Sequence, residues 1–228
     1  MSRLALFRRA CAVVLFGVAS LPGGALAVPS DTSAAATPVV MRAIALAEDR
    51  RDGASGTLQR ALAHEDATVR ARAALALGRL QDSSDVAVLV PVLRDRVAAV
   101  RREAAFALGQ IGHRDARGPL EDALRDADPE VVELAVEALG KLGDRAATPR
   151  VVPFLRRGTS AQRMRAAESL WRLADTSATD ALIAALSERD PAVRWRVVYA
   201  LEKLPASARR VNAVVPLLHD PDALWEIP

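Results

Sequence analysis

Apolar residues recur along the chain with a period of 31 residues, marked by Ala-Leu-Gly at residues 76–78, 107–109 and 138–140. Extending this step gives an unbroken leucine column of Leu46, Leu77, Leu108, Leu139, Leu170 and Leu201. A second unbroken column consists of Leu62, Leu93, Leu124, Leu155, Leu186 and Leu217. A third column, of valines, is interrupted by Gln162. Such self-similarity at a fixed spacing is typical of repeat architectures, in which each unit packs against its neighbours.

Each repeat unit contains two helical patterns and no alternation typical of a strand. A longer stripe predicts a helix that we term helix B, formed in one unit by Val100, Ala104, Ala107, Leu108 and Ile111. A shorter preceding stripe predicts helix A, formed there by Leu89, Val92 and Leu93. We therefore expect an all-α solenoid over residues 38–220, with a first helix near 38–50, five A–B pairs, and a tail or partial cap at 221–228.

The helix B sequence also has a recognisable form. It reads Val-Arg-x-x-Ala-Ala-x-Ala-Leu-Gly-x-Ile-Gly at residues 100–112, with looser copies at 69–80, 131–143, 162–174 and 193–204. This pattern resembles the short bacterial HEAT-like repeat, also called the phycobilin-lyase HEAT-like repeat. The resemblance covers about residues 38–220 and implies an α-solenoid whose B helices line the concave face.

Residues 1–27 have the order of a secretory signal peptide. Three arginines precede an apolar run at 10–21, and Ala-Leu-Ala at 25–27 supplies a small-residue cleavage site. The run is too short to span the hydrocarbon core of a bilayer as a helix, which disfavours an uncleaved anchor. We expect cleavage after residue 27, a flexible linker at 28–37, and export to the periplasm or beyond. Membrane contact is expected only through the signal peptide before cleavage.

The basic charge of the full chain does not indicate a nucleic-acid partner. The net charge is +3, but three of the 31 Lys and Arg residues and none of the 28 acidic residues lie in the signal peptide. Residues 28–228 are therefore neutral, which argues against nucleic-acid binding. Cys11, the single cysteine, also lies in the signal peptide, so the mature chain depends on packing without disulfides.

Four arginines share one position of the repeat, and the ladder is broken by Val132. Two interpretations are open for the ladder: Arg70, Arg101, Arg163 and Arg194. They could form an anion-binding groove, or they could pair structurally with carboxylates in the turns between helices A and B, namely Asp66, Asp128 or Asp190. The structural interpretation is favoured, because an exported repeat protein of balanced charge needs such turn contacts.

The histidines form no recognisable catalytic or metal site. His64-Glu65 is similar to the dipeptide with which HEAT-repeat deoxyhypusine hydroxylases bind iron, but the chain has no second such pair. One pair supplies too few ligands for a dinuclear site. His113 shares a turn position with Asp82 and Asp144, which predicts a surface turn residue. Without nucleophile or phosphate-binding motifs, we expect no enzyme activity, no cofactor and no metal. A lyase-like or hydroxylase-like activity stays open.

The outward columns of helix B supply the best candidate for a binding surface. On this concave face Trp195 and Tyr199 are i, i+4 neighbours. Aromatic side chains interspersed with cations are typical of interface hot spots. The predicted partner-binding residues are Phe106, Met164, Trp171, Trp195, Tyr199, Arg172 and Lys203. The alternative is that these large groups pack against a C-terminal cap containing Trp225 and Ile227.

The leading functional prediction is an exported scaffold that binds another protein, of unknown identity, through its concave face. The resemblance to phycobilin lyases implies an alternative, an accessory factor for the maturation of a cofactor-carrying protein. A degenerate metal-dependent hydroxylase is the third hypothesis, and it depends on His64 alone.

Overall fold

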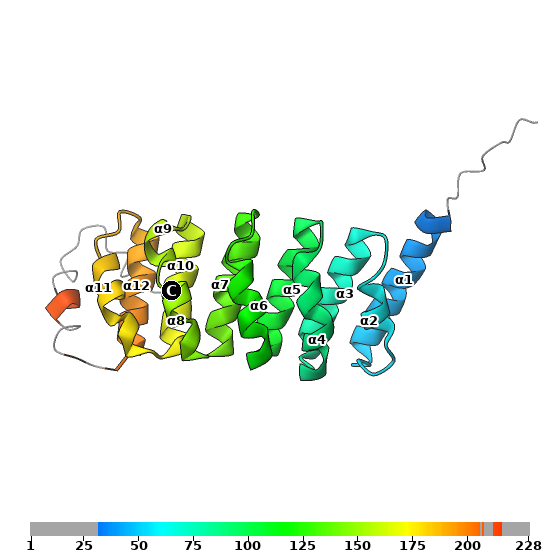
Figure 1. Cartoon of the computed structure of the whole chain (residues 1–228), viewed down its shortest axis with the longest axis horizontal. Helices are drawn as coiled ribbons and strands as arrows, with labels where there is room; N and C mark the ends of the chain where they lie inside the picture. The colour runs from blue at the N-terminus through cyan, green and yellow to red at the C-terminus, as the bar shows by residue number, and fades with distance from the viewer. Residues whose placement is uncertain (1–31, 206, 208–211, 216–228) are drawn as a thin grey trace, which may run out of the picture.

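The computed structural model describes residues 32–205, 207 and 212–215, which form a single row of helices (Figure 1). The first helix, α1 (Thr32–Asp49), is followed by five units, each with a short A segment and a long B helix. In the first unit, α2 (Thr57–Ala61) precedes the B helix α3 (Ala67–Leu80). In the second, the A segment consists of η1 (Ser83–Asp85), α4 (Val86–Leu89) and η2 (Val90–Arg94), and the B helix is α5 (Ala98–Ile111). In the third, η3 (Arg114–Ala116) and α6 (Arg117–Ala123) precede α7 (Pro129–Leu142). In the fourth, η4 (Arg145–Ala147), α8 (Thr148–Val151) and α9 (Phe154–Arg157) precede α10 (Ser160–Leu173). In the fifth, η5 (Thr176–Ala178) and α11 (Thr179–Ala185) precede α12 (Pro191–Lys203).

The predicted all-α solenoid is confirmed, since every regular element in the described part of the chain is helical. One boundary is wrong. Helix α1 begins at Thr32, so residues 32–37 of the predicted 28–37 linker are helical. Three consecutive alanines at 34–36 favour helix over a flexible connection. The predicted signal peptide and the tail at 221–228 lie outside the described residues.

No helix in the described ranges combines the length and apolar character needed to cross a bilayer.

The leucine columns form the core between units. Leu77, Leu108, Leu139, Leu170 and Leu201 are all fully buried. Leu46 departs from its column and is 42% exposed, because no described unit precedes α1 to cover that face. Ile44 and Ala47 are the buried residues of α1 instead. The repeat period therefore predicts the interior of the array correctly but not its first helix.

Consecutive B helices approach each other closely because small residues meet along them. A Cβ atom at Gly78 would lie 2.6 Å from the Cα atom of Ala107, and one at Gly109 would lie 2.9 Å from that of Ala138. Consecutive A segments contact each other much less than consecutive B helices do. The B helices therefore form one face of the row and the A segments the other, and the B face is the one that the HEAT-like resemblance implies to be concave.

The arginine ladder is structural and joins neighbouring units at the A–B turns. Arg70 donates two hydrogen bonds to the carboxylate of Asp95, at 2.7 and 2.9 Å. Arg101 donates two to Asp126, both at 2.7 Å. These guanidinium hydrogen bonds stabilise the ionised carboxylates and hold the pKa of Asp95 and of Asp126 below the ordinary value. An anion-binding role for these two arginines is thereby excluded, because their charge is already matched.

The partners of the ladder differ from the predicted ones, however. Asp66, Asp128 and Asp190 cap the B helices, where each side chain accepts a backbone N–H of the first turn. The carboxylate that meets the arginine lies 25 residues further along, in the next unit. A third ion pair, between Arg163 and Glu188 at 3.1 Å, follows the same rule.

One rung of the ladder is missing, and both of its positions have changed. Val132 stands at the arginine position and is buried, while Arg157 stands at the carboxylate position and is exposed. The Arg157 side chain has no hydrogen bond or ion pair with any described residue. The buried Gln162 joins these two units instead, donating from Nε2 to the carbonyl of Pro129 at 3.0 Å. The polar interruption in the valine column therefore has a structural role.

Candidate functional site

Three aromatic rings meet on the concave face of the last two units. Tyr199 stacks on Trp195 in α12, with ring centroids 5.6 Å apart and planes 15° from parallel. This contact follows from their i, i+4 spacing on one helix face. Trp171 of α10 meets Tyr199 edge-on, with centroids 6.1 Å apart and planes at 84°. Both arrangements are the favourable ones for aromatic pairs, so the three rings form one cluster.

Trp171 joins the cluster because it replaces a glycine of the repeat. In earlier units this position is Gly78, Gly109 or Gly140, against which the next B helix packs closely. An indole cannot fit in that space, and α10 and α12 contact each other less extensively than the preceding B helices do. The Trp171 side chain thus replaces the close glycine contact between the last two B helices.

A cation lies over each ring of the cluster. Lys203 Nζ lies 5.0 Å from the centroid of Tyr199, and the guanidinium of Arg196 lies 5.0 Å from Trp195. Arg172 lies 5.5 Å from the ring of Trp171. Such contacts stabilise the cations over the ring faces. The result is a half-exposed aromatic surface with cationic side chains at its margin. Two of these cations also pair with carboxylates, Arg172 with Glu168 at 2.8 Å and Lys203 with Glu202 at 3.7 Å. Arg196 is not among the residues predicted from the sequence.

Two predicted residues lie apart from this cluster. Phe106 is on α5, with the α7 helix between it and α10, and Lys141 Nζ lies 5.4 Å from its ring centroid. Met164 is half-buried on α10 and packs against the core. The structure therefore brings together Trp171, Trp195, Tyr199, Arg172 and Lys203 and leaves Phe106 and Met164 outside the cluster.

Next to the cluster lies a charged network that the sequence analysis did not identify. Arg165 Nε lies 3.1 Å from Glu133 and 3.3 Å from Glu137, and its Nη1 lies 3.4 Å from Glu168. Partial burial works to lower the pKa of Arg165, but the carboxylates of Glu137, Glu133 and Glu168 outweigh it and raise that pKa. Arg165 and Glu168 are i, i+3 neighbours on α10, but Glu133 and Glu137 belong to α7 in the preceding unit, so no local motif reveals the whole network.

The histidines have local roles in turns. His64 Nδ1 accepts a hydrogen bond from the backbone N–H of Asp66 at 3.0 Å. His113 Nδ1 accepts one from Asp115 at 3.3 Å, which confirms the predicted surface turn residue. In the ranges that the structure describes, no three His, Cys, Asp or Glu side chains converge to hold a metal. His219 lies outside those ranges.

A model of HEAT repeats matches residues 39–105, 86–163 and 152–225, so the matches together extend over residues 39–225. The chain belongs to the HEAT-repeat family. The predicted resemblance to the phycobilin-lyase HEAT-like repeats is also confirmed, by a solved structure. This is the complex of CpcE and CpcF of phycocyanin lyase from Nostoc sp. PCC7120, with 25% identity, a TM-score of 0.61, and coverage of 71% of this chain and 69% of that one.

Two further solved structures share the same fold. A designed armadillo repeat protein in complex with the peptide (KR)4 gives a TM-score of 0.61 at 19% identity, covering 79% of this chain and 96% of that one. An engineered protein gives a TM-score of 0.54 at 25% identity, covering 78% and 92%. No curated protein sequence matches the chain.

Proposed function

We propose that this HEAT-repeat protein is an exported scaffold that binds another protein through the concave face of its last two units. The observation that carries the proposal is the half-exposed ring cluster of Trp171, Trp195 and Tyr199. Aromatic and arginine side chains supply much of the binding energy of protein interfaces. The solenoid itself does not require such residues there, since Ala71 and Leu75 fill the positions of Trp195 and Tyr199 in the first unit.

An unsatisfied donor supports a role beyond packing. The indole Nε1 of Trp171 is enclosed and has no acceptor among the described residues. Enclosed polar groups in folded proteins normally have a partner, and one that lacks it weakens the packing of its surroundings.

The family and its structural relatives support the partner class. HEAT and armadillo solenoids are in general protein-interaction folds, and the two solved relatives above are a complex of two proteins and a complex with a peptide. The proposal of export rests on the n-region, apolar run and Ala-Leu-Ala site of residues 1–27. The mature chain is proposed to be periplasmic or secreted.

A crosslinking pull-down from the exported fraction tests the binding site. The native mature protein is compared with a Trp195→Ala/Tyr199→Ala variant, whose folding is verified by circular dichroism. A matched control, Val88→Ala/Arg94→Ala, changes an apolar and a cationic residue exposed on the A side of the solenoid. A partner captured by the native protein and by the control, and lost in the aromatic variant, is the expected result. Equal capture by all three proteins would remove the concave cluster from the proposal.

The likeness to the phycocyanin lyase complex favours one second candidate, an accessory role in the maturation of a cofactor-carrying protein. Such a factor would hold the cofactor or its acceptor protein in the same concave groove. The visible absorption spectrum of the protein purified from its native fraction separates the two candidates. A bound chromophore favours the accessory role, whereas a colourless protein with a stable protein partner favours the scaffold.

A further inference from the structure

A second surface, on the A side of the solenoid, carries arginines that the concave site does not use. Arg94, Arg125 and Arg156 lie at one repeat position near the ends of successive A segments, 31 residues apart, and Arg157 follows directly. All four are exposed. Three hollows lie between neighbouring A segments here, so the arginines border concave sites and not a flat surface.

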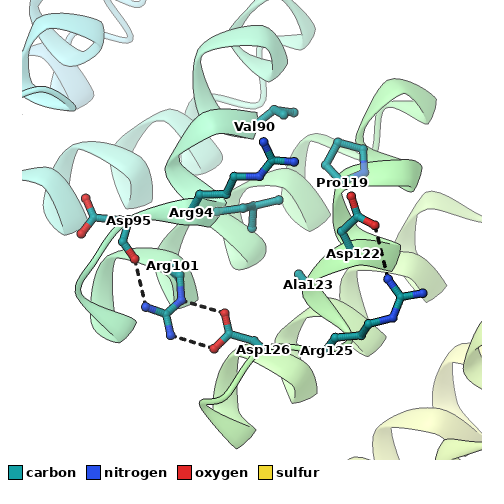
Figure 2. A pocket seen from close by; sticks show the side chains of 10 residues that line it. Val90, Arg94, Asp95, Arg101, Pro119, Asp122, Ala123, Arg125 and Asp126 are labelled. Carbon is teal, nitrogen blue, oxygen red and sulfur yellow. Dashed lines mark hydrogen bonds and ion pairs between the residues drawn. The ribbon is translucent and has the colours of Figure 1, made fainter.

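The first hollow, between η2 and α6, is balanced in charge (Figure 2). It has a volume of about 360 Å³. Its charged lining consists of three arginines and three aspartates, Arg94, Arg101, Arg125, Asp95, Asp122 and Asp126. Two of these pairs are formed within the hollow, Arg101 with Asp126 at 2.7 Å and Arg125 with Asp122 at 3.7 Å. This hollow offers no excess charge to a ligand.

The second hollow, between α6 and the α8 and α9 helices, has an excess of positive charge. It has a volume of about 450 Å³, and three arginines line it, Arg125, Arg150 and Arg157. Arg125 is shared with the first hollow, where it pairs with Asp122, so the excess here comes from Arg150 and Arg157. Glu121 is its one acidic residue, and it is shared, since it lies 3.0 Å from Arg117 and 3.7 Å from Arg150. Apolar side chains complete the lining, namely Leu124, Pro149, Pro153 and Phe154.

The third hollow, on the other side of α9, has a volume of about 260 Å³ and continues this positive charge. Arg156 and Arg157 line it without any acidic residue. The excess comes from the missing rung of the ladder, because Arg157 stands where other units place a carboxylate. Helix α9 is therefore a basic ridge with an apolar-lined hollow on either side, and neither the Arg156 nor the Arg157 side chain is paired with a described residue.

We propose that these two hollows and the ridge between them bind an acidic segment of a partner protein that also carries a large apolar side chain. Guanidinium groups recognise carboxylates with two parallel hydrogen bonds. The Arg157 side chain is unpaired among the described residues, and Arg150 contacts Glu121 only through Nε, at 3.7 Å, so its two Nη groups face no described carboxylate. The apolar side chain of the segment is buried against Phe154 and the two prolines of the second hollow. A nucleic acid would match the charge but would leave this apolar lining without a complementary group.

Fluorescence anisotropy with the full mature protein tests this site. The probe is a fluorescein-labelled peptide of alternating Glu and Leu, and a Gln–Leu peptide serves as the uncharged comparison. Arg150→Glu/Arg157→Glu is expected to weaken binding of the acidic peptide by about tenfold or more, because the peptide loses charge-assisted hydrogen bonds to the guanidinium groups. Arg94→Glu/Arg96→Glu makes the same charge change near the balanced hollow and is expected to weaken binding less than about twofold, since distant charges are screened.

Three results would overturn the proposal. In the first, the native protein binds the acidic peptide no more tightly than the Gln–Leu peptide. In the second, both charge-reversal variants weaken binding of the acidic peptide equally. In the third, a single-stranded DNA of the same charge competes with the acidic peptide as effectively as unlabelled peptide does. If charge reversal lowers the melting temperature, Arg150→Gln/Arg157→Gln replaces it, and unchanged binding there would also contradict the proposal. Trp195→Ala/Tyr199→Ala should leave peptide binding unchanged, which keeps this test separate from that of the concave site.

Discussion

At the scale of single residues, the arginine ladder shows how one side chain links two repeat units. The Arg101 and Asp126 side chains are only 16% and 11% exposed, so their ion pair is shielded from solvent. Arg101 also donates to the carbonyl of Asp95 at 2.9 Å, which ties the end of helix A to helix B. Removing such a guanidinium leaves an enclosed carboxylate without its partner, and an unpaired enclosed charge lowers the stability of the fold strongly.

We expect Arg101→Met to lower the free energy of unfolding by about 2–3 kcal/mol, because Asp126 loses two charge-assisted hydrogen bonds. Arg125→Met is the matched control, since its pair with Asp122 is 74% and 66% exposed and 3.7 Å long. That control should cost less than about 0.5 kcal/mol. Urea denaturation of the three proteins measures both values, and equal losses would contradict the structural role of the ladder.

The same ion pair makes stability depend on pH in a defined direction. The hydrogen bond from Arg101 lowers the pKa of Asp126 in the folded state, so the unfolded chain binds the proton more readily. The pair therefore stabilises the fold above the unfolded pKa of about 4, and this contribution is lost as the pH falls through the lower folded value. The difference in unfolding free energy between the native protein and Arg101→Met should shrink between about pH 7 and about pH 3. A difference that grows on acidification would contradict this assignment.

At the scale of helices, close packing depends on the absence of a side chain at one position of α3, α5 and α7, which is Gly78, Gly109 and Gly140. A Cβ atom at Gly109 would lie 2.8 Å from the Cβ atom of Ala138, so α5 and α7 would have to separate. We expect Gly109→Ala to destabilise the protein by about 1–3 kcal/mol through overpacking. Gly118→Ala is the control in α6, where nothing lies within 4 Å, and it should stabilise by about 0.5 kcal/mol. Thermal denaturation distinguishes them, and a neutral Gly109→Ala would argue against tight helix contact.

The helices at the two ends of the array differ from those inside it. Leu108→Ala should cost about 2–5 kcal/mol, because it leaves a cavity at a fully buried position. Leu46→Ala removes the same group from the same column in α1, where the residue is 42% exposed, and should cost less than about 1 kcal/mol. Equal losses on denaturant unfolding would show that the N-terminal face of α1 is covered in solution.

At the scale of the whole molecule, the period of 31 residues predicts the fold well because each unit packs in the same way as the next. Helix pairs, buried columns and the turn role of His113 follow from it. The partner of Arg101 does not follow from the period, because it lies 25 residues away in the next unit and only the packing of neighbouring units reveals the contact. The helix at 32–37 does not follow either, because these residues precede the first repeat.

The candidate site is likewise predicted in part. The i, i+4 spacing of Trp195 and Tyr199 on helix B identifies their stacking from the sequence. The edge contact with Trp171 requires knowing how α10 lies against α12. Phe106 and Met164 share the outward columns, but a column extends over all five units and does not define a cluster. The cationic hollows beside α9 are missed because they appear only where one rung of the ladder is replaced.

The measurement that tests the central claim most directly is site-specific photocrosslinking of the mature protein in its exported fraction. A benzophenone amino acid replaces Lys203 on the concave face or, as the control, Val88 on the A side, both of them exposed. A protein adduct from position 203, absent from position 88 and abolished by Trp195→Ala/Tyr199→Ala in the same chain, is the predicted result. An adduct from position 88 alone, or one from position 203 that persists without the two aromatic side chains, would contradict the claim that this face binds the partner.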